Sequence, residues 1–218
     1  MKEKRLLWIG YILIAGFVIW TLLIQAVDVQ PLGINGTNIG FATINCWFHR
    51  LTGVHMVIYT ITDWLGIIPV FICIIFGGIG CVQLLKRRSL LKVDYDIIFL
   101  GAYYILVILG YSIFEMIPIN YRPILIEGFM EASYPSSTTL LVLCVMSTLI
   151  EQINRRSKNE MVKKIVKVLV ICFSIFMVVC RLISGVHWLT DIIGSIMLSI
   201  GLFCIYKSAV LLCYKREN

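Results

Sequence analysis

Residues 64 to 88 read WLGIIPVFICIIFGGIGCVQLLKRR, an uncharged stretch of 22 residues followed by three basic ones. A helix that crosses the hydrocarbon core of a bilayer needs about 20 consecutive, mostly apolar residues. The stretch therefore predicts a transmembrane helix over Trp64–Leu85, with Lys86-Arg87-Arg88 at one membrane surface. The segments on either side of this helix are therefore expected to lie in the membrane or at its surface.

The composition of the whole chain agrees with several such crossings. Of its 218 residues, 60% are hydrophobic and 14% are charged, and the mean hydropathy is +0.93. In a water-soluble protein, so little polar surface could not cover so much apolar surface. The composition argues against a soluble enzyme, a nucleic-acid-binding domain and a disordered regulator, although the formal net charge is +7.

Hydropathy along the chain predicts six transmembrane helices in one all-α bundle. This is a polytopic membrane protein with a single membrane domain over residues 1–218. The spans are expected at about Leu6–Val27, Trp64–Leu85, Tyr95–Phe114, Ser136–Ile150, Ile165–Cys180 and Ile192–Cys213. The fourth and fifth are short for a crossing, so their ends are expected to extend into the flanking polar segments.

The basic residues fall mainly on one side of this predicted bundle. Six spans place both termini on one side, which carries 16 of the 19 lysines and arginines: Lys2, Lys4, Arg5, Lys86, Arg87, Arg88, Lys92, Arg155, Arg156, Lys158, Lys163, Lys164, Lys167, Lys207, Lys215 and Arg216. The other side carries Arg50, Arg122 and Arg181. By the positive-inside rule, the chain is a plasma-membrane protein with both termini in the cytoplasm.

The longest segment on the outer side, Asp28–Asp63, has its own apolar pattern. Large apolar residues fall there at near-helical spacing: Phe41, Ile44, Phe48 and Leu51, with Trp47 alongside. This spacing is typical of a helix that lies in the membrane interface. A loop packed on the bundle is the alternative.

Three separated segments place polar residues at the outer face of the predicted bundle. They are residues 115–123 (EMIPINYRP), 131–139 (EASYPSSTT) and 181–191 (RLISGVHWLTD). Ionisable residues at membrane level are costly, so a cluster of them predicts a functional site. The orientation of the spans was derived from the lysine and arginine counts and not from these segments. It nevertheless places all three segments at the same membrane face.

The residue types in these segments suit phosphate binding. Pro135-Ser136-Ser137 predicts a helix start, where free N–H groups and the helix dipole attract an anion. Arg122 and Arg181 each offer a planar fork to phosphate oxygens. His187 and Asp191 would share a helix face, with the aspartate accepting the Nδ1 proton and leaving Nε2 free as base or nucleophile. The alternatives are structural: a satisfied hydrogen bond for this pair, and capping or helix packing for the hydroxyls.

The three segments resemble the motifs of the phosphatidic acid phosphatase type 2 superfamily of lipid phosphatases. The family pattern is Lys, six residues, Arg-Pro; then Pro-Ser-any-His; then Ser-Arg, five residues, His, three residues, Asp. Arg122-Pro123 match the end of the first motif, and Pro135-Ser136-Ser137 match the start of the second. Arg181, His187 and Asp191 match the third with both spacings intact. The resemblance covers a phosphatase-like core of about residues 60–213.

The resemblance implies a role for each matching residue. His187 would be the nucleophile that forms a phosphohistidine, and Asp191 would orient it. The phosphate would be held by Arg122, Ser136, Ser137 and Arg181. The family implies no metal and no other cofactor, and the eight cysteines show no metal-ligand spacing.

Three positions depart from the family pattern. Glu115 replaces the first-motif lysine, which reverses a charge near an anionic substrate. Thr138 replaces the second-motif histidine, the usual general acid, and Cys180 replaces the third-motif serine. An unassisted leaving group forfeits roughly 10²–10⁴ in rate. Catalysis would survive if the leaving group departs unaided, or if a protonated Glu115 or Glu131 donates the proton.

The leading prediction is an integral-membrane lipid phosphatase whose active site lies at the extracytoplasmic face. It would remove phosphate from undecaprenyl diphosphate or a glycerolipid phosphate in the outer leaflet, through a phosphohistidine intermediate. The alternatives are a catalytically impaired protein that binds lipid or a partner on the same scaffold, and a lipid phosphotransferase. The expected partner is a membrane lipid and not a nucleic acid; the sequence leaves the oligomeric state open.

Overall fold

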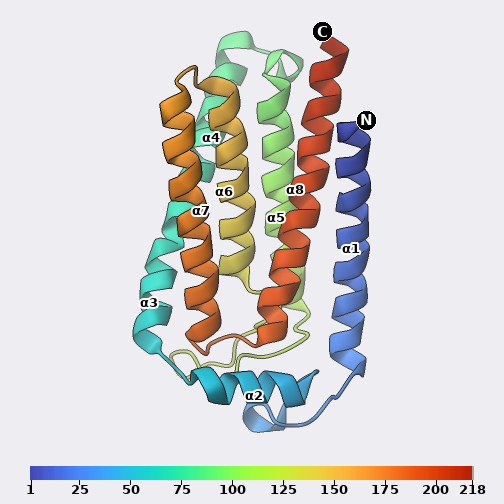
Figure 1. The fold of residues 1–218 in the computed structure, drawn as a ribbon, viewed down its shortest axis with the longest axis vertical. Coiled ribbons are helices and arrows are strands. Elements are labelled where there is room, and N and C mark those ends of the chain that lie inside the picture. Colours follow the sequence, from blue (N-terminus) through green and yellow to red (C-terminus); the bar gives the residue numbers. More distant parts are fainter. Residues whose placement is uncertain (218) are drawn as a thin grey trace.

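The computed structural model describes residues 1–217, without the side chains of Lys2, Arg216 and Glu217. Helices packed side by side form an elongated bundle (Figure 1). They are α1 (Lys2–Ala26), α2 (Ala42–Thr52), α3 (Met56–Leu65), α4 (Ile67–Arg87), α5 (Tyr95–Met116), α6 (Ser137–Arg156), α7 (Glu160–Ile183) and α8 (Leu189–Glu217), with the short 3₁₀ turns η1 (Ile34–Gly36) and η2 (Leu90–Lys92).

Six helical segments within residues 1–217 are long and apolar enough to cross a membrane. They are Glu3–Ala26, Met56–Arg87, Tyr95–Met116, Ser137–Arg156, Glu160–Ile183 and Leu189–Lys215. The predicted six-span, all-α membrane protein is confirmed. The fourth and fifth spans extend beyond their apolar cores, as expected. The backbone of α7 starts early because the Asn159 side chain caps it, accepting from the Met161 N–H at 2.9 Å.

The second span differs from its predicted form, because it is longer and is interrupted at Gly66. Together α3 and α4 cover Met56–Arg87, whereas hydropathy predicted Trp64–Leu85. The N–H of Gly66 bonds to two carbonyls of the last turn of α3, each at 3.0 Å, and the helix resumes one residue later. The extra helix α3 packs against α7. This packing brings Tyr59 and Asp63 to the end of α7.

Helix α1 runs alongside α8 through most of the bundle (Figure 1). A Cβ atom added to Gly10 would lie 2.6 Å from Cγ1 of Ile205, so this small residue allows the two helices to approach closely. Farther along α1, the hydroxyls of Thr21 and Tyr134 hydrogen-bond at 2.7 Å. Tyr134 is buried just before α6, so this bond holds the start of α6 against α1.

Helix α2 lies across one end of the bundle, roughly perpendicular to the spans (Figure 1). The structure thus confirms a helix in the outer segment where the apolar spacing predicted one. Its buried side is fixed by Asn45, whose Nδ2 donates to Oγ1 of Thr190 at 3.0 Å. Trp47 and Leu51 are 60% and 68% exposed. An exposed apolar face on a helix in this position is typical of contact with the membrane interface.

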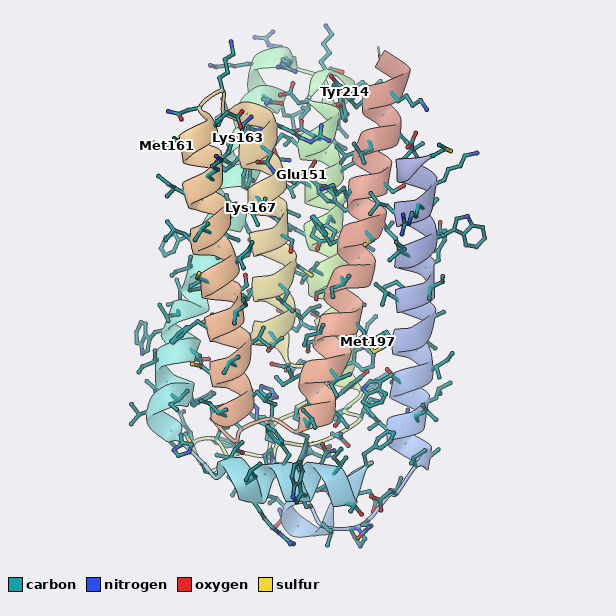
Figure 2. The ribbon with its side chains drawn as sticks, in the orientation of Figure 1. Glu151, Met161, Lys163, Lys167, Met197 and Tyr214 are labelled. Carbon is teal, nitrogen blue, oxygen red and sulfur yellow. The ribbon has the colours of Figure 1, made fainter. Side chains whose placement is uncertain are left out.

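The opposite end of the bundle, the terminal end, carries both termini and most of the charge. Glu151, Lys163 and Tyr214 lie toward it (Figure 2). Ion pairs join its helices, as between Arg156 and Asp96 at 2.7 Å. The three polar segments singled out from the sequence converge at the other end, next to α2 (Figure 1). The two ends are therefore chemically distinct, as the alternating basic content predicted.

Candidate active site

The connection between α5 and α6 folds back on itself as an irregular hairpin. The N–H of Arg122 donates to the carbonyl of Glu131 at 3.0 Å, and the N–H of Ser133 donates to the carbonyl of Asn120 at 2.9 Å. The tip turns through Gly128, whose φ of 85° favours glycine. The hairpin holds the Arg122 side chain and the Ser133 carbonyl in fixed positions.

The turn between α7 and α8 is held from two sides. Gly185 has a φ of 72°, and a Cβ atom there would lie 2.1 Å from the carbonyl oxygen of Gly53. Only glycine allows this approach to the connection between α2 and α3. On the other side, Nε1 of Trp188 donates to the carbonyl of Tyr121 at 2.7 Å. Between these two anchors lies His187.

The imidazole of His187 is buried, with 4% of the residue exposed. Its Nδ1 lies 3.1 Å from the carbonyl oxygen of Ser133. A carbonyl can only accept, so this bond places the proton on Nδ1 and leaves the lone pair on Nε2. Nε2 has no hydrogen-bond partner among the described residues. The ring is thus oriented with a free basic nitrogen.

Asp191 lies next to His187, as the four-residue spacing predicted, but farther from Nδ1 than a hydrogen bond requires. Its Oδ2 lies 3.7 Å from Nδ1 of His187 and instead accepts the N–H of Trp188 at 2.8 Å. The spacing argument required both residues to be helical, but α8 starts at Leu189. A carboxylate in the first turn that bonds back to the residue before the helix stabilises the helix start. Asp191 therefore positions the loop that carries His187.

Burial keeps His187 uncharged at neutral pH. Removal of the ring from water lowers its pKa to about 4, and the positive charges of Arg122 and Arg181 push in the same direction. The nearby carboxylate of Asp191 opposes the shift without cancelling it. A neutral imidazole with its lone pair on Nε2 is the form that a nucleophile requires.

Arg181 lies at the end of α7 and is almost completely buried, with 1% exposed. Its Nη2 donates to Oδ1 of Asp63 at 3.0 Å and to Oγ1 of Thr138 at 2.5 Å. The centre of its guanidinium group lies 4.8 Å from the ring centroid of Tyr59, a cation–π contact. This side chain joins α3, α6 and α7 at one point.

Arg122 approaches the same tyrosine from the α5–α6 hairpin. Its guanidinium carbon lies 5.8 Å from the ring centroid of Tyr59. Its Nε forms an ion pair with Oε2 of Glu131 at 3.1 Å, although not in hydrogen-bond geometry. Two guanidinium groups from distant parts of the chain thus share one aromatic ring.

Unpartnered polar atoms concentrate at this end of the bundle. Nine buried side-chain nitrogen or oxygen atoms within residues 1–217 have no hydrogen-bond partner, and all but one belong to residues of the three polar segments. The nine are Tyr103 Oη, Asn120 Nδ2, Arg122 Nε and Nη1, Ser133 Oγ, Arg181 Nε and Nη1, His187 Nε2 and Asp191 Oδ1. Proteins seldom leave buried donors unsatisfied. Three guanidinium nitrogens have neither a hydrogen-bond partner nor an ion pair, namely Arg122 Nη1 and Arg181 Nε and Nη1. Together with the free imidazole nitrogen they suit an oxyanion.

The N-terminus of α6 provides further donors. Ser136 precedes the helix without capping it, because its Oγ donates to Oγ1 of Thr139 at 3.1 Å. Its carbonyl accepts from the Ser195 hydroxyl at 3.0 Å, which fixes α6 to α8. A cavity of about 310 Å³ beside this helix start is lined in part by Ser137 and Thr138. A helix N-terminus facing a cavity can contribute N–H groups and a positive dipole to anion binding.

Most of the residues predicted for the site gather at this end of the bundle: Arg122, Glu131, Ser136, Ser137, Thr138, Arg181, His187 and Asp191. Glu115 also lies at this end, but it does not contact the site. It is exposed in the last turn of α5, and among the described residues its carboxylate contacts neither arginine nor His187. Sequence reasoning missed Tyr59, Asp63 and the Ser133 carbonyl. The one usable signal was Asp63, a single acidic residue between two apolar stretches.

Comparisons with known proteins agree with this arrangement. A model of the PAP2 superfamily matches residues 97–214, more than half of the chain. The sequence comparison with curated proteins gives no match. Among solved structures, the chain is similar to the first transmembrane PAP2 type phosphatidylglycerolphosphate phosphatase from Bacillus subtilis. The TM-score is 0.63 and the identity 15%, over 93% of this chain and 94% of that one. At this identity the likeness shows the fold alone.

The protein is a multi-pass membrane protein, and its fold is similar to that of a PAP2-type phosphatase. One end of its six spans holds a buried imidazole and two buried guanidinium groups. The matched region contains all three polar segments. The chain belongs to the PAP2 superfamily, as the resemblance of its motifs implied.

Proposed function

We propose that this protein is an integral-membrane lipid phosphatase that works through a phosphohistidine on His187. The observation that carries the proposal is a buried, neutral imidazole with a free Nε2, set beside two buried guanidinium groups whose nitrogens lack partners. A structural histidine would be expected to satisfy both ring nitrogens. The geometry instead leaves the nucleophilic atom and the oxyanion donors available.

In the proposed reaction, Nε2 of His187 attacks the phosphorus of the substrate while the Ser133 carbonyl holds the ring through Nδ1. Arg122 and Arg181 donate to the phosphoryl oxygens as charge develops on them. Fixed donors in a site removed from water are the main source of transition-state stabilisation in phosphoryl transfer. Ser136, Ser137 and the N–H groups at the start of α6 complete the binding of the phosphate. Water then hydrolyses the phosphohistidine.

The proposed substrate is a lipid phosphate or diphosphate, with undecaprenyl diphosphate or a glycerolipid phosphate as candidates. The cavity beside α6 combines polar residues with apolar ones of α4 and α6, such as Ile67, Val70 and Leu141. This lining suits the apolar chain of a lipid, next to a phosphate site that the cavity reaches through the contacts of Asp63 and Thr138 with Arg181. With basic residues concentrated at the terminal end, the positive-inside rule puts both termini in the cytoplasm of a plasma-membrane protein. The site then opens to the outer leaflet.

Purified protein is expected to release phosphate from a panel of lipids in detergent micelles. We expect turnover of undecaprenyl diphosphate to exceed that of phosphatidic acid roughly tenfold, because a phosphate leaving group needs less acid assistance than an alkoxide. The comparison variant combines Thr138→His with Glu115→Lys, which restores two of the three departing positions to the family pattern and should narrow the ratio of the two turnover rates. Lipid binding without turnover in both proteins would instead favour the impaired, lipid-binding alternative that Thr138 motivates.

The pH dependence of kcat/KM is expected to report the buried imidazole. With a pKa of about 4, His187 keeps its lone pair at pH 5 and loses it only as the pH falls through 4. An ordinary histidine, with a pKa near 6.5, would be about 30-fold depleted in its neutral form at pH 5. We therefore expect kcat/KM to fall on the acid side near pH 4, once the profile has been corrected for the ionisation of the substrate phosphate near pH 6. A fall in kcat/KM centred near pH 6.5 would contradict the inference that burial keeps the His187 imidazole neutral.

A further inference from the structure

The Asp63 side chain lies beside Thr138, where the family pattern has a histidine. Nη2 of Arg181 donates to Oδ1 of Asp63 at 3.0 Å and to Oγ1 of Thr138 at 2.5 Å, so the two oxygens are neighbours on one nitrogen. Both residues also line the cavity of about 310 Å³ at the start of α6. A carboxyl group therefore stands next to the position from which an acid is missing.

We propose that Asp63 is the catalytic acid–base residue, which protonates the leaving oxygen and then activates the hydrolytic water. This inference rests on the proposed function, because it assigns a residue to that reaction. It replaces both donors suggested by the sequence. Among the described residues, Glu115 makes no contact with the site. Glu131 contacts Arg122, whereas Asp63 shares an Arg181 nitrogen with Thr138, the position that lacks the acid.

The exposure of Asp63 suits proton exchange. Its side chain is 59% exposed, whereas that of its partner Arg181 is 2% exposed. The pair therefore links a buried cation to a carboxylate that faces the cavity and solvent. An acid–base group that must be reprotonated in every cycle needs such access, and it must also reach the reacting oxygens. Asp63 contacts Nη2 of Arg181, and the other two nitrogens of the same guanidinium group are proposed phosphate donors, so the carboxyl group lies one guanidinium group away from the proposed phosphate site.

The proposed cycle is balanced in atoms and protons. In the first step, Nε2 of His187 forms a bond to phosphorus, the bond from phosphorus to the leaving oxygen breaks, and the carboxyl proton of Asp63 moves to that oxygen. In the second step, a water oxygen attacks phosphorus and gives one proton to the Asp63 carboxylate. The P–N bond then breaks, and its electron pair returns to His187. The cycle consumes one water and regenerates both residues.

The test compares Asp63→Asn with the wild type on two leaving groups. One substrate is phosphatidic acid, whose alkoxide needs a proton; the other is p-nitrophenyl phosphate, whose phenolate leaves unaided. Asparagine keeps the size of the side chain and an oxygen that accepts from Arg181. We expect kcat on phosphatidic acid to fall roughly 10²-fold, a loss about ten times larger than on p-nitrophenyl phosphate, with little change in KM.

A rescue variant separates chemistry from structure. Adding Thr138→His to Asp63→Asn places an acid next to the lost carboxyl, and it should recover roughly tenfold in kcat on phosphatidic acid. Equal losses on both substrates, with a raised KM and no rescue, would make Asp63 only a structural partner of Arg181 and overturn the proposal. Failure of the wild type to release phosphate from both substrates and from undecaprenyl diphosphate would instead overturn the proposed function, so the two failures are distinct.

Discussion

The His187→Asn variant is expected to lose phosphate release from lipid substrates by roughly 10⁴-fold or more, because it lacks the proposed nucleophile. Asparagine is the informative replacement. Its side-chain amide can still donate to the Ser133 carbonyl, as Nδ1 does at 3.1 Å, while the atom equivalent to Nε2 is gone. The loop should therefore keep its position. Phosphate release and chemical trapping of a phosphoenzyme measure the two consequences, and the trapped label should disappear with the activity.

A matched histidine at the same end of the bundle controls for nonspecific effects. His55 is exposed, and its Nε2 lies at hydrogen-bond distance, 2.8 Å, from the carbonyl oxygen of Thr52. His55→Asn is expected to keep its activity within about twofold, because changes at exposed positions away from the site are usually small. If folded His187→Asn kept even a tenth of wild-type turnover, His187 would not be the nucleophile.

The membrane architecture could be predicted from the sequence because the bilayer imposes strong constraints. Apolar length and the distribution of basic residues suffice to predict six spans and to separate the two ends. The boundaries were less predictable. Hydropathy predicted that the fifth span starts at Ile165, but α7 starts at Glu160, because the Asn159 side chain caps the backbone there. The interruption at Gly66 also left no mark, because apolar residues flank it on both sides.

The site was predictable where side chains carry the signal and unpredictable where backbone or packing does. Arg181 and His187 could be singled out because their chemistry is costly near a membrane. The carbonyl of Ser133, which orients the imidazole, has no counterpart in the side-chain pattern. Tyr59 lies in an apolar stretch of the sequence, where a tyrosine is typical of a packing residue. In the structure, α3 places its ring in contact with the guanidinium groups of Arg122 and Arg181. The distance between Asp191 and Nδ1 of His187 is longer than the helical spacing suggests, because α8 starts beyond His187.

Arg181→Met is expected to lower turnover roughly 10³-fold while leaving the protein at least as stable as the wild type. The loss follows because fixed cationic donors stabilise the charge of a transferring phosphoryl group. The free energy of unfolding is not expected to fall together with the turnover. Nε and Nη1 of Arg181 are buried without partners, and each such group costs roughly 1–3 kcal/mol. Its ion-pair partner Asp63 is largely exposed and can be solvated when the arginine is gone.

The apparent melting temperature in detergent and the rate of phosphate release, measured on the same preparation, test this divergence. Arg181→Lys serves as the intermediate variant, because it keeps the charge but loses the planar fork and much of the stacking on Tyr59. Its activity should lie between those of wild type and Arg181→Met. A parallel fall of activity and melting temperature in Arg181→Met would show that the arginine holds α3, α6 and α7 together. If Arg181 serves phosphate binding at the expense of stability, Arg181→Met should lose turnover while its melting temperature stays the same or rises.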